Sequence, residues 1–188
     1  FGIEFLAQQK LSKNFYGILA YTWVKSEFKD QFNNFVPSSW DNGHIISLTA
    51  GKKFKKDWEI GLKFRFSGGA PYTPYDTLIS SLIQVWDVSN MGLFDYERLN
   101  ELRLNANHGL DLRIDKKWFW EKVALNVYLD IQNLYNFQAE TPPSLIVLND
   151  DDGNRLIHPT DNTRYQTSLI QNTSGPCLLY TSPSPRDK

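Results

Sequence analysis

The residue types of the chain first allow a hydrolytic site. Ser67, His108 and Asp111 are the types that a serine hydrolase uses as nucleophile, base and orienting carboxylate. Asp111, however, begins the segment 111–117, in which charges of both signs alternate with aliphatic residues. Such a segment neutralises itself as a solvated wall, and a triad is recognised by its geometry, not by its residue types. We therefore predict that the chain is not an enzyme.

Metal binding is the second chemistry to consider. The segment 149–154 reads NDDDGN, but it lacks the D-x-D-x-D-G spacing and the later glutamate of a calcium loop. His44, His108 and His158 are widely scattered, and Cys177 is the single cysteine, so neither a histidine cluster, a cysteine-based metal site nor an internal disulfide is expected. We predict no metal and no cofactor.

The elements that carry these residues are predicted to be β-strands. Strict alternation of aliphatic and polar residues runs through 110–115, breaks at 116–122 and returns at 125–132. A period of two indicates a pleated strand, because successive side chains point to opposite faces. Similar alternation predicts strands at 2–11, 15–25, 45–54 and 58–67. The predicted tight turns lie near Lys13, Lys56 and Phe119, and the predicted long loops near Asn33, Trp86 and Asp151.

The contrast between the two faces of these strands predicts a membrane protein. One face is aliphatic, the other carries ionised groups in mid-strand, and Trp118, Phe119 and Trp120 stand together at a turn. This is the pattern of a barrel wall in lipid around a wet lumen. No apolar run approaches the roughly 20 residues of a spanning helix, and a net charge of -1 gives no footprint for nucleic acid. For 15–25, which face would meet lipid stays open.

The predicted fold is therefore all-β, an antiparallel up-and-down transmembrane β-barrel. About six strands, with part of another near 165–170, fall short of the roughly eight of the smallest closed barrels. Lipid does not tolerate the open edges of such a sheet, so we expect a piece of a larger barrel. We assign residues 1–176 to the barrel part. The tail 177–188 begins CLLYTSPSPRD, which resembles a translated sequencing adapter; a natural Ser/Pro-rich tail is the alternative.

Four segments resemble one known family. They are HGLDLRIDKKW (108–118), LNVYLDIQNLYN (125–136), FRFSGGAPYTP (64–74) and FLAQQKLSKNFYGILAYTW (5–23). Together they resemble the C-terminal barrel region of TonB-dependent outer-membrane receptors, particularly those of Bacteroidetes-type bacteria, and the resemblance covers residues 1–175 in order.

The resemblance implies active import across the outer membrane of a Gram-negative bacterium. Such receptors close about 22 strands around an N-terminal plug domain, and they bind a siderophore, cobalamin or a glycan. TonB, powered through ExbB and ExbD, then pulls on the plug. In glycan-importing relatives a surface lipoprotein accompanies the receptor. The expected partners are thus outer-membrane lipid, the plug, the TonB–ExbB–ExbD complex and such a lipoprotein, with no nucleic acid.

Two sets of side chains are the candidate site. The polar set is predicted to face the plug or line water in the lumen: Glu59, Lys63, Arg65, Asp111, Arg113, Asp115, Asp130 and Gln132. The aromatic set lies in the long loop and offers planes that suit sugars or aromatic chelators: Tyr72, Tyr75, Trp86, Phe94 and Tyr96. For the aromatic set, packing of the loop on itself is an equally compatible interpretation.

Two other functions compete with active import. One is a passive porin-like or purely structural outer-membrane barrel, which an upstream plug-encoding region would argue against. The other is an outer-membrane enzyme, which activity assays of Ser67 or His108 variants of the full-length protein would test.

Overall fold

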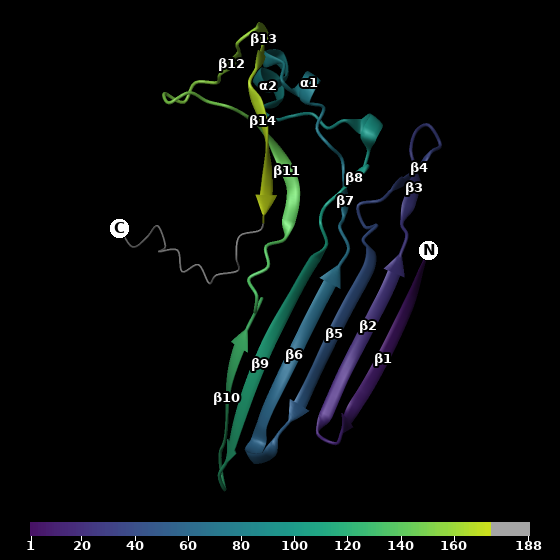
Figure 1. Ribbon diagram of the computed structural model, residues 1–188, viewed down its shortest axis with the longest axis vertical. Helices are drawn as coiled ribbons and strands as arrows, with labels where there is room; N and C mark the ends of the chain where they lie inside the picture. The colour runs from purple at the N-terminus through teal and green to yellow at the C-terminus, as the bar shows by residue number, and fades with distance from the viewer. Residues whose placement is uncertain (174–188) are drawn as a thin grey trace.

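The computed structural model describes residues 1–173 and consists mostly of antiparallel β-structure, which confirms the all-β prediction. The predicted non-native tail, 177–188, and Cys177 lie outside the described residues. The main element is one sheet of six strands that lie side by side in the order in which they occur along the chain (Figure 1). The small strands of the connections are not part of it. In spatial order its six strands are β1 (Gly2–Ser12), β2 (Phe15–Val24), β5 (Gly43–Lys53), β6 (Trp58–Ser67), β9 (Asn107–Phe119) and β10 (Ala124–Ile131).

Short turns join these strands at one end of the sheet. The β1–β2 turn places Lys13 and Asn14 at φ 49° and 65°, the left-handed backbone of a two-residue hairpin turn. The β5–β6 turn contains the short 3-10 helix η1 (Lys55–Asp57). The predicted turn positions are confirmed, and Figure 1 shows all three at the lower end of the sheet.

The predicted break at 116–122 is wrong in its extent. The β9 strand continues to Phe119, with Lys116 opposite Val127 and Trp118 opposite Leu125, and the turn is closed by the Trp120 amide donating to the Val123 carbonyl at 2.8 Å. The side chains continue to alternate between the two faces, and Lys116 occupies a position on the aliphatic face. Because its charge does not fit the aliphatic pattern, the sequence showed a break there.

At the opposite end, long connections join β2 to β5 and β6 to β9, a third long segment follows β10, and all three carry small elements of their own (Figure 1). The first is a hairpin, and the second contains two short helices where no periodicity was visible in the sequence. The third holds two further strand pairs, β11 with β14 and β12 with β13, so a strand near 165–170 is confirmed. These elements are β3 (Glu27–Lys29), β4 (Phe35–Pro37), β7 (Pro71–Tyr72), α1 (Thr77–Ser80), α2 (Ile83–Ser89), η2 (Tyr96–Arg98), β8 (Leu102–Arg103), β11 (Glu140–Val147), β12 (Ile157–His158), β13 (Asp161–Tyr165) and β14 (Thr167–Thr173).

The aliphatic face of the sheet is uncovered, and many side chains of the polar face are exposed as well. Ile60, Leu62 and Val127 are 37%, 43% and 50% exposed, whereas Asp115, on the opposite face, is only 9% exposed. Among residues 1–173 the only buried large hydrophobic side chains are Trp86 and Leu145, and both lie at the loop end. No second layer in this part of the chain covers the aliphatic face.

The sheet is open within the described residues. Within residues 1–173, its outer strands β1 and β10 are each paired on one side only. No helix in this range is long and apolar enough to cross a membrane.

Two facing glycines toward the short-turn end make room in the sheet for a large ring. Gly51 lies opposite both Tyr16 and Gly61, and a Cβ at Gly51 would overlap the Tyr16 phenol, which donates to Glu59 Oε1 at 2.7 Å. At Gly61 the nearest atom to an added Cβ is 3.9 Å away.

We therefore expect Gly51→Ala to displace Tyr16 from Glu59 and to lower the free energy of unfolding by about 1 kcal/mol. Urea titration of the full-length protein followed by circular dichroism measures this change. The matched Gly61→Ala variant should stay within about 0.5 kcal/mol of the parent. In a Tyr16→Phe background, where no hydrogen bond remains to be lost, Gly51→Ala should cost clearly less; an undiminished cost there would contradict the explanation.

Candidate functional site

Strand register brings the predicted polar set onto one face of the sheet. Glu59 lies opposite Asp115, Lys63 opposite Asp111, and Arg113 opposite Asp130, so these side chains project to the same side. Arg65 follows Lys63 at the next position of β6 on that face. Gln132 comes just after β10 and lines the same hollow as Lys63 and Asp130.

Both arginines of this polar face are paired with carboxylates of the same face. Arg65 Nη2 lies 2.8 Å from Asp111 Oδ2, and Arg113 holds both oxygens of Asp115 at 2.8 and 3.0 Å. The Arg113 guanidinium also stacks over the Tyr128 ring, 4.1 Å from its centroid. Bidentate and stacked arginines are well-ordered groups, so the polar face is a pre-arranged network.

Several members of this network were not in the predicted set. Tyr16 reaches across β5 to Glu59, and Asn126 Nδ2 donates to Asp115 at 3.4 Å. Asp111 also accepts from the Asn133 amide at 3.0 Å, where the chain bulges after β10. The signal that identifies these partners is the cross-strand register, which sequence alternation alone does not supply.

A hollow of about 300 Å³ lies in the middle of the polar face. Gly61 forms part of its floor, and Tyr16, Lys63, Arg113 and Asp130 are among its walls. A side chain from another chain segment could enter here and meet groups of both charge signs.

The opposite face is aliphatic in the middle and aromatic toward its ends. Trp58 and Trp118 lie near the short turns, and Tyr21, Trp23 and Phe66 near the long connections. At the loop end, two histidine–tyrosine hydrogen bonds lie at the margin of this face. The Tyr21 hydroxyl is 2.9 Å from His44 Nδ1, and the Tyr135 hydroxyl is 2.7 Å from His108 Nδ1. An apolar band with aromatic margins is typical of a surface that spans lipid.

Lysines gather at the short-turn end of the sheet. We call this group the lysine belt, and it consists of Lys10, Lys13, Lys52, Lys53, Lys55, Lys56, Lys116, Lys117 and Lys122. Among residues 1–173, Asp57, Glu59, Asp115 and Glu121 bring carboxylates to the same turns and strand ends, and Asp115 is held by Arg113.

The hydrolytic candidates do not converge. His108 lies opposite Phe66 on the aliphatic face, whereas Asp111 is on the polar face. Ser67 Oγ donates to the Gly68 carbonyl at 3.3 Å. In 149–154, Asp150 Oδ1 accepts from the amides of Asp152 and Asn154 at 3.0 and 2.7 Å, which closes a turn. No group of His, Cys, Asp or Glu within 1–173 is arranged to hold a metal ion.

The predicted aromatic set is partly brought together. Tyr75 and Phe94 stack at 4.6 Å between centroids, and Phe94 meets Tyr96 edge-on at 6.4 Å. Tyr75 and Trp86 line one cavity of about 450 Å³, whose polar margin includes Arg155. Tyr96 is 72% exposed, whereas Trp86 is 7% exposed. Tyr72 pairs with Leu102 in the β7–β8 ladder, apart from the stack.

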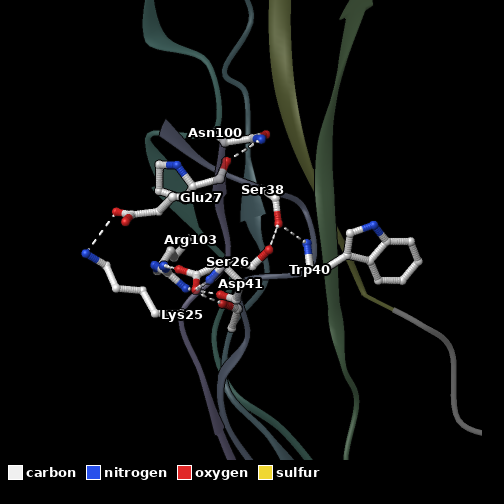
Figure 2. A network of polar contacts seen from close by, with 10 residues as sticks. Lys25, Ser26, Glu27, Ser38, Trp40, Asp41, Asn100 and Arg103 are labelled. Atoms are coloured by element: carbon white, nitrogen blue, oxygen red, sulfur yellow. Dashed lines mark hydrogen bonds and ion pairs between the residues drawn. The ribbon is translucent and has the colours of Figure 1, made fainter. Parts of the chain in front are cut away.

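A buried polar cluster ties the first two long connections together (Figure 2). Asp41 accepts from the Ser26 amide at 2.8 Å and forms an ion pair with Arg103 from β8. Ser38 Oγ donates to Ser26 Oγ at 2.7 Å, and Asn100 Nδ2 donates to the Pro37 carbonyl at 2.8 Å. This cluster joins segments more than sixty residues apart, and sequence inspection missed it because nothing local marks Asp41 as buried.

Burial opposes ionisation of Asp41 and by itself would raise its pKa. The hydrogen bond from the Ser26 amide and the ion pair with Arg103 outweigh that effect, so the pKa of the Asp41 carboxyl lies below its usual value. The carboxylate is therefore the form that holds the two connections together.

No protein-family model, curated protein or solved structure matches the chain. A function is therefore inferred from the geometry of the sheet and its connections and from the sequence resemblance.

Asp41→Asn is expected to loosen the first connection. The change removes the charge that Arg103 faces while keeping the shape, and leaving buried groups imperfectly paired costs about 1–3 kcal/mol. Trypsin cleavage after Lys25 or Lys29 in the full-length protein should become several-fold faster. The control is Glu27→Gln, which removes the exposed ion pair with Lys25 in the same connection and should leave the rate near that of the parent. Equal acceleration by both variants would contradict the role given to Asp41.

The same cluster should respond to acid. Because the folded-state pKa of Asp41 is lowered, its stabilisation is complete above the unfolded pKa of about 3.9 and is lost as pH falls through the folded value. The protection of the amides in 26–41, measured as exchange rates corrected for the intrinsic pH dependence of amide exchange, should therefore fall below about pH 4. In Asp41→Asn this fall should be absent, and an unchanged pH profile of protection in that variant would exclude Asp41 as the titrating group.

Proposed function

We propose that the chain is a C-terminal wall segment of a TonB-dependent receptor in the outer membrane of a Gram-negative bacterium. The receptor would import a scarce nutrient such as a siderophore, cobalamin or a glycan. In this proposal the chain is part of a closed barrel of about 22 strands, a number that comes from the family resemblance.

The uncovered aliphatic face of the sheet is the observation that carries this proposal. Aliphatic side chains such as Leu62 and Val127 stay exposed, while Asp115 is sheltered. In water, each large aliphatic side chain left exposed forgoes about 1.5–3 kcal/mol of burial energy. Hydrocarbon from lipid restores that energy along the whole face, whereas solvent does not.

Strand length and open edges support the same interpretation. The strands of the main sheet run from 8 to 13 residues, which suits the roughly 9–11 needed by a tilted transmembrane strand. The unpaired sides of β1 and β10 would be costly in lipid, so each requires a further strand. A larger barrel provides those strands.

The polar face supports the presence of a plug. Its arginines are already ordered by carboxylates, and a hollow with charges of both signs lies at its centre. Such a surface can hydrogen-bond a folded domain without rearranging, which keeps the entropic cost of docking low. TonB would act through that plug, with ExbB and ExbD as its energy source.

The loop end would supply ligand contacts. The Tyr75–Phe94–Tyr96 stack ends in an exposed ring, and the cavity beside Tyr75 joins apolar walls to Arg155. Trp86 would support that cavity from within rather than contact ligand directly, since it is buried. A surface lipoprotein could cover this end in a glycan importer.

A passive pore is the second candidate, because a laterally paired polar face also suits a water-filled lumen. The two functions differ in what precedes this segment. An in-frame plug domain upstream of residue 1 is expected for import, and a complete gene without one would favour the pore.

Cysteine labelling of the full-length protein in intact cells tests the wall and its orientation together. Leu62→Cys should react with a lipid-soluble maleimide but not with a membrane-impermeant one, whereas Lys63→Cys should escape the lipid-soluble probe because it lies on the other face. Thr77→Cys, exposed in the second connection, should react with the impermeant probe from outside, and Asp57→Cys in a short turn should not. Reaction of Asp57→Cys but not of Thr77→Cys with the impermeant probe would contradict the proposed orientation. Reaction of Leu62→Cys with that probe would contradict the proposal that its face contacts lipid.

A further inference from the structure

Arginines and lysines are used differently in this protein. Every arginine within residues 1–173 forms an ion pair with a carboxylate, whether in the sheet or in the long connections. Over the same residues, no member of the lysine belt does so. Within residues 1–173, the charges of the lysine belt are therefore not neutralised by ion pairs.

Two lysines of the belt belong to the aliphatic face itself. Lys116 lies opposite Trp58 and Val127, and Lys52 lies opposite Phe15 and Ile60. A lysine at such a position is costly in hydrocarbon unless its methylene chain carries the ammonium group to the margin of the aliphatic band.

Both ammonium groups do reach the margin. Lys116 Nζ lies 5.7 Å from the centroid of the Trp58 ring and 5.3 Å from that of Trp118, and it donates to the Lys56 carbonyl in the turn. Lys52 Nζ lies 5.6 Å from the centroid of the Phe54 ring. Aromatic faces thus hold two cations where the aliphatic band ends.

We propose that the lysine belt binds the phosphate groups of anionic glycerophospholipids in the leaflet at the short-turn side. Acyl chains would lie along the aliphatic face while the headgroup meets Lys52, Lys116 and the neighbouring turn lysines. A lipid with net negative charge fits because the belt carries excess positive charge, whereas a zwitterionic headgroup brings its own ammonium. This inference rests on the proposed membrane wall and adds a lipid preference to it.

The test uses photo-crosslinking phospholipids and the full-length protein in zwitterionic phosphatidylcholine vesicles. Two probes are compared, phosphatidylglycerol and phosphatidylcholine. They have identical acyl chains, and each carries a photoreactive group near its headgroup. Adducts are located by mass spectrometry on peptides that contain Trp58 or Trp118. We expect labelling by the anionic probe to exceed that by the zwitterionic probe about five-fold or more, as a surface lysine near anionic lipid implies.

The variant that tests the two lysines is the double change Lys52→Gln with Lys116→Gln, which should bring labelling by the two probes to near equality. Lys63→Gln, on the polar face of the same sheet, is the matched control and should keep the full preference. If the double variant does not fold, Lys52→Arg with Lys116→Arg retains both charges and should retain the preference.

The failures of the two proposals are distinguishable. Equal labelling of the parent protein by both probes overturns the lipid preference but leaves the membrane wall intact. A preference that survives the double glutamine change overturns the assignment to Lys52 and Lys116. Stronger labelling of these peptides by a lipid A probe overturns the choice of glycerophospholipid. A third probe, phosphatidylcholine with the photoreactive group in its acyl chain, tests the wall itself: absence of its adducts along Ile60 and Leu112 overturns the wall, and with it this inference.

Discussion

The separation of hydrocarbon from charge across a single layer of β-sheet is the constraint on which the structure depends. A pleated strand sends alternate side chains to opposite faces, and six adjacent strands keep this alternation in register. A shift of one residue in any strand would place a charged group such as Lys63 among the aliphatic side chains. The pairing register is therefore specified by the contrast between the two faces as much as by the turns.

The polar face shows how a charged surface can be ordered without a protein core behind it. Arg113 and Asp115 lie on one strand and pair through two hydrogen bonds, while Tyr16 reaches Glu59 across β5. The glycine at position 51 makes room for that ring. Small residues and long polar residues thus complement one another, and the face is complete before any partner arrives.

The two ends of the sheet obey different rules. At the loop end, carboxylates and arginines pair, and the Asp41 cluster and the packing of Trp86 against its surroundings give the connections a structure of their own. At the short-turn end the connections are only a few residues long, and their lysines lack carboxylate partners within residues 1–173. One end is thus stabilised internally, while the other presents uncompensated positive charge.

Local alternation was enough to predict the six strands of the main sheet, the short turns and the common face of Glu59, Arg65 and Asp111, because the period of a pleated strand depends only on neighbouring residues. It failed at Lys116, where a charged residue sits at an aliphatic position and only the paired strand and the rings of Trp58 and Trp118 explain it. It could not find the Asp41–Arg103 pair, the contact of Tyr16 with Glu59 or the burial of Trp86. Those contacts join segments tens of residues apart, so the tertiary structure alone decided them.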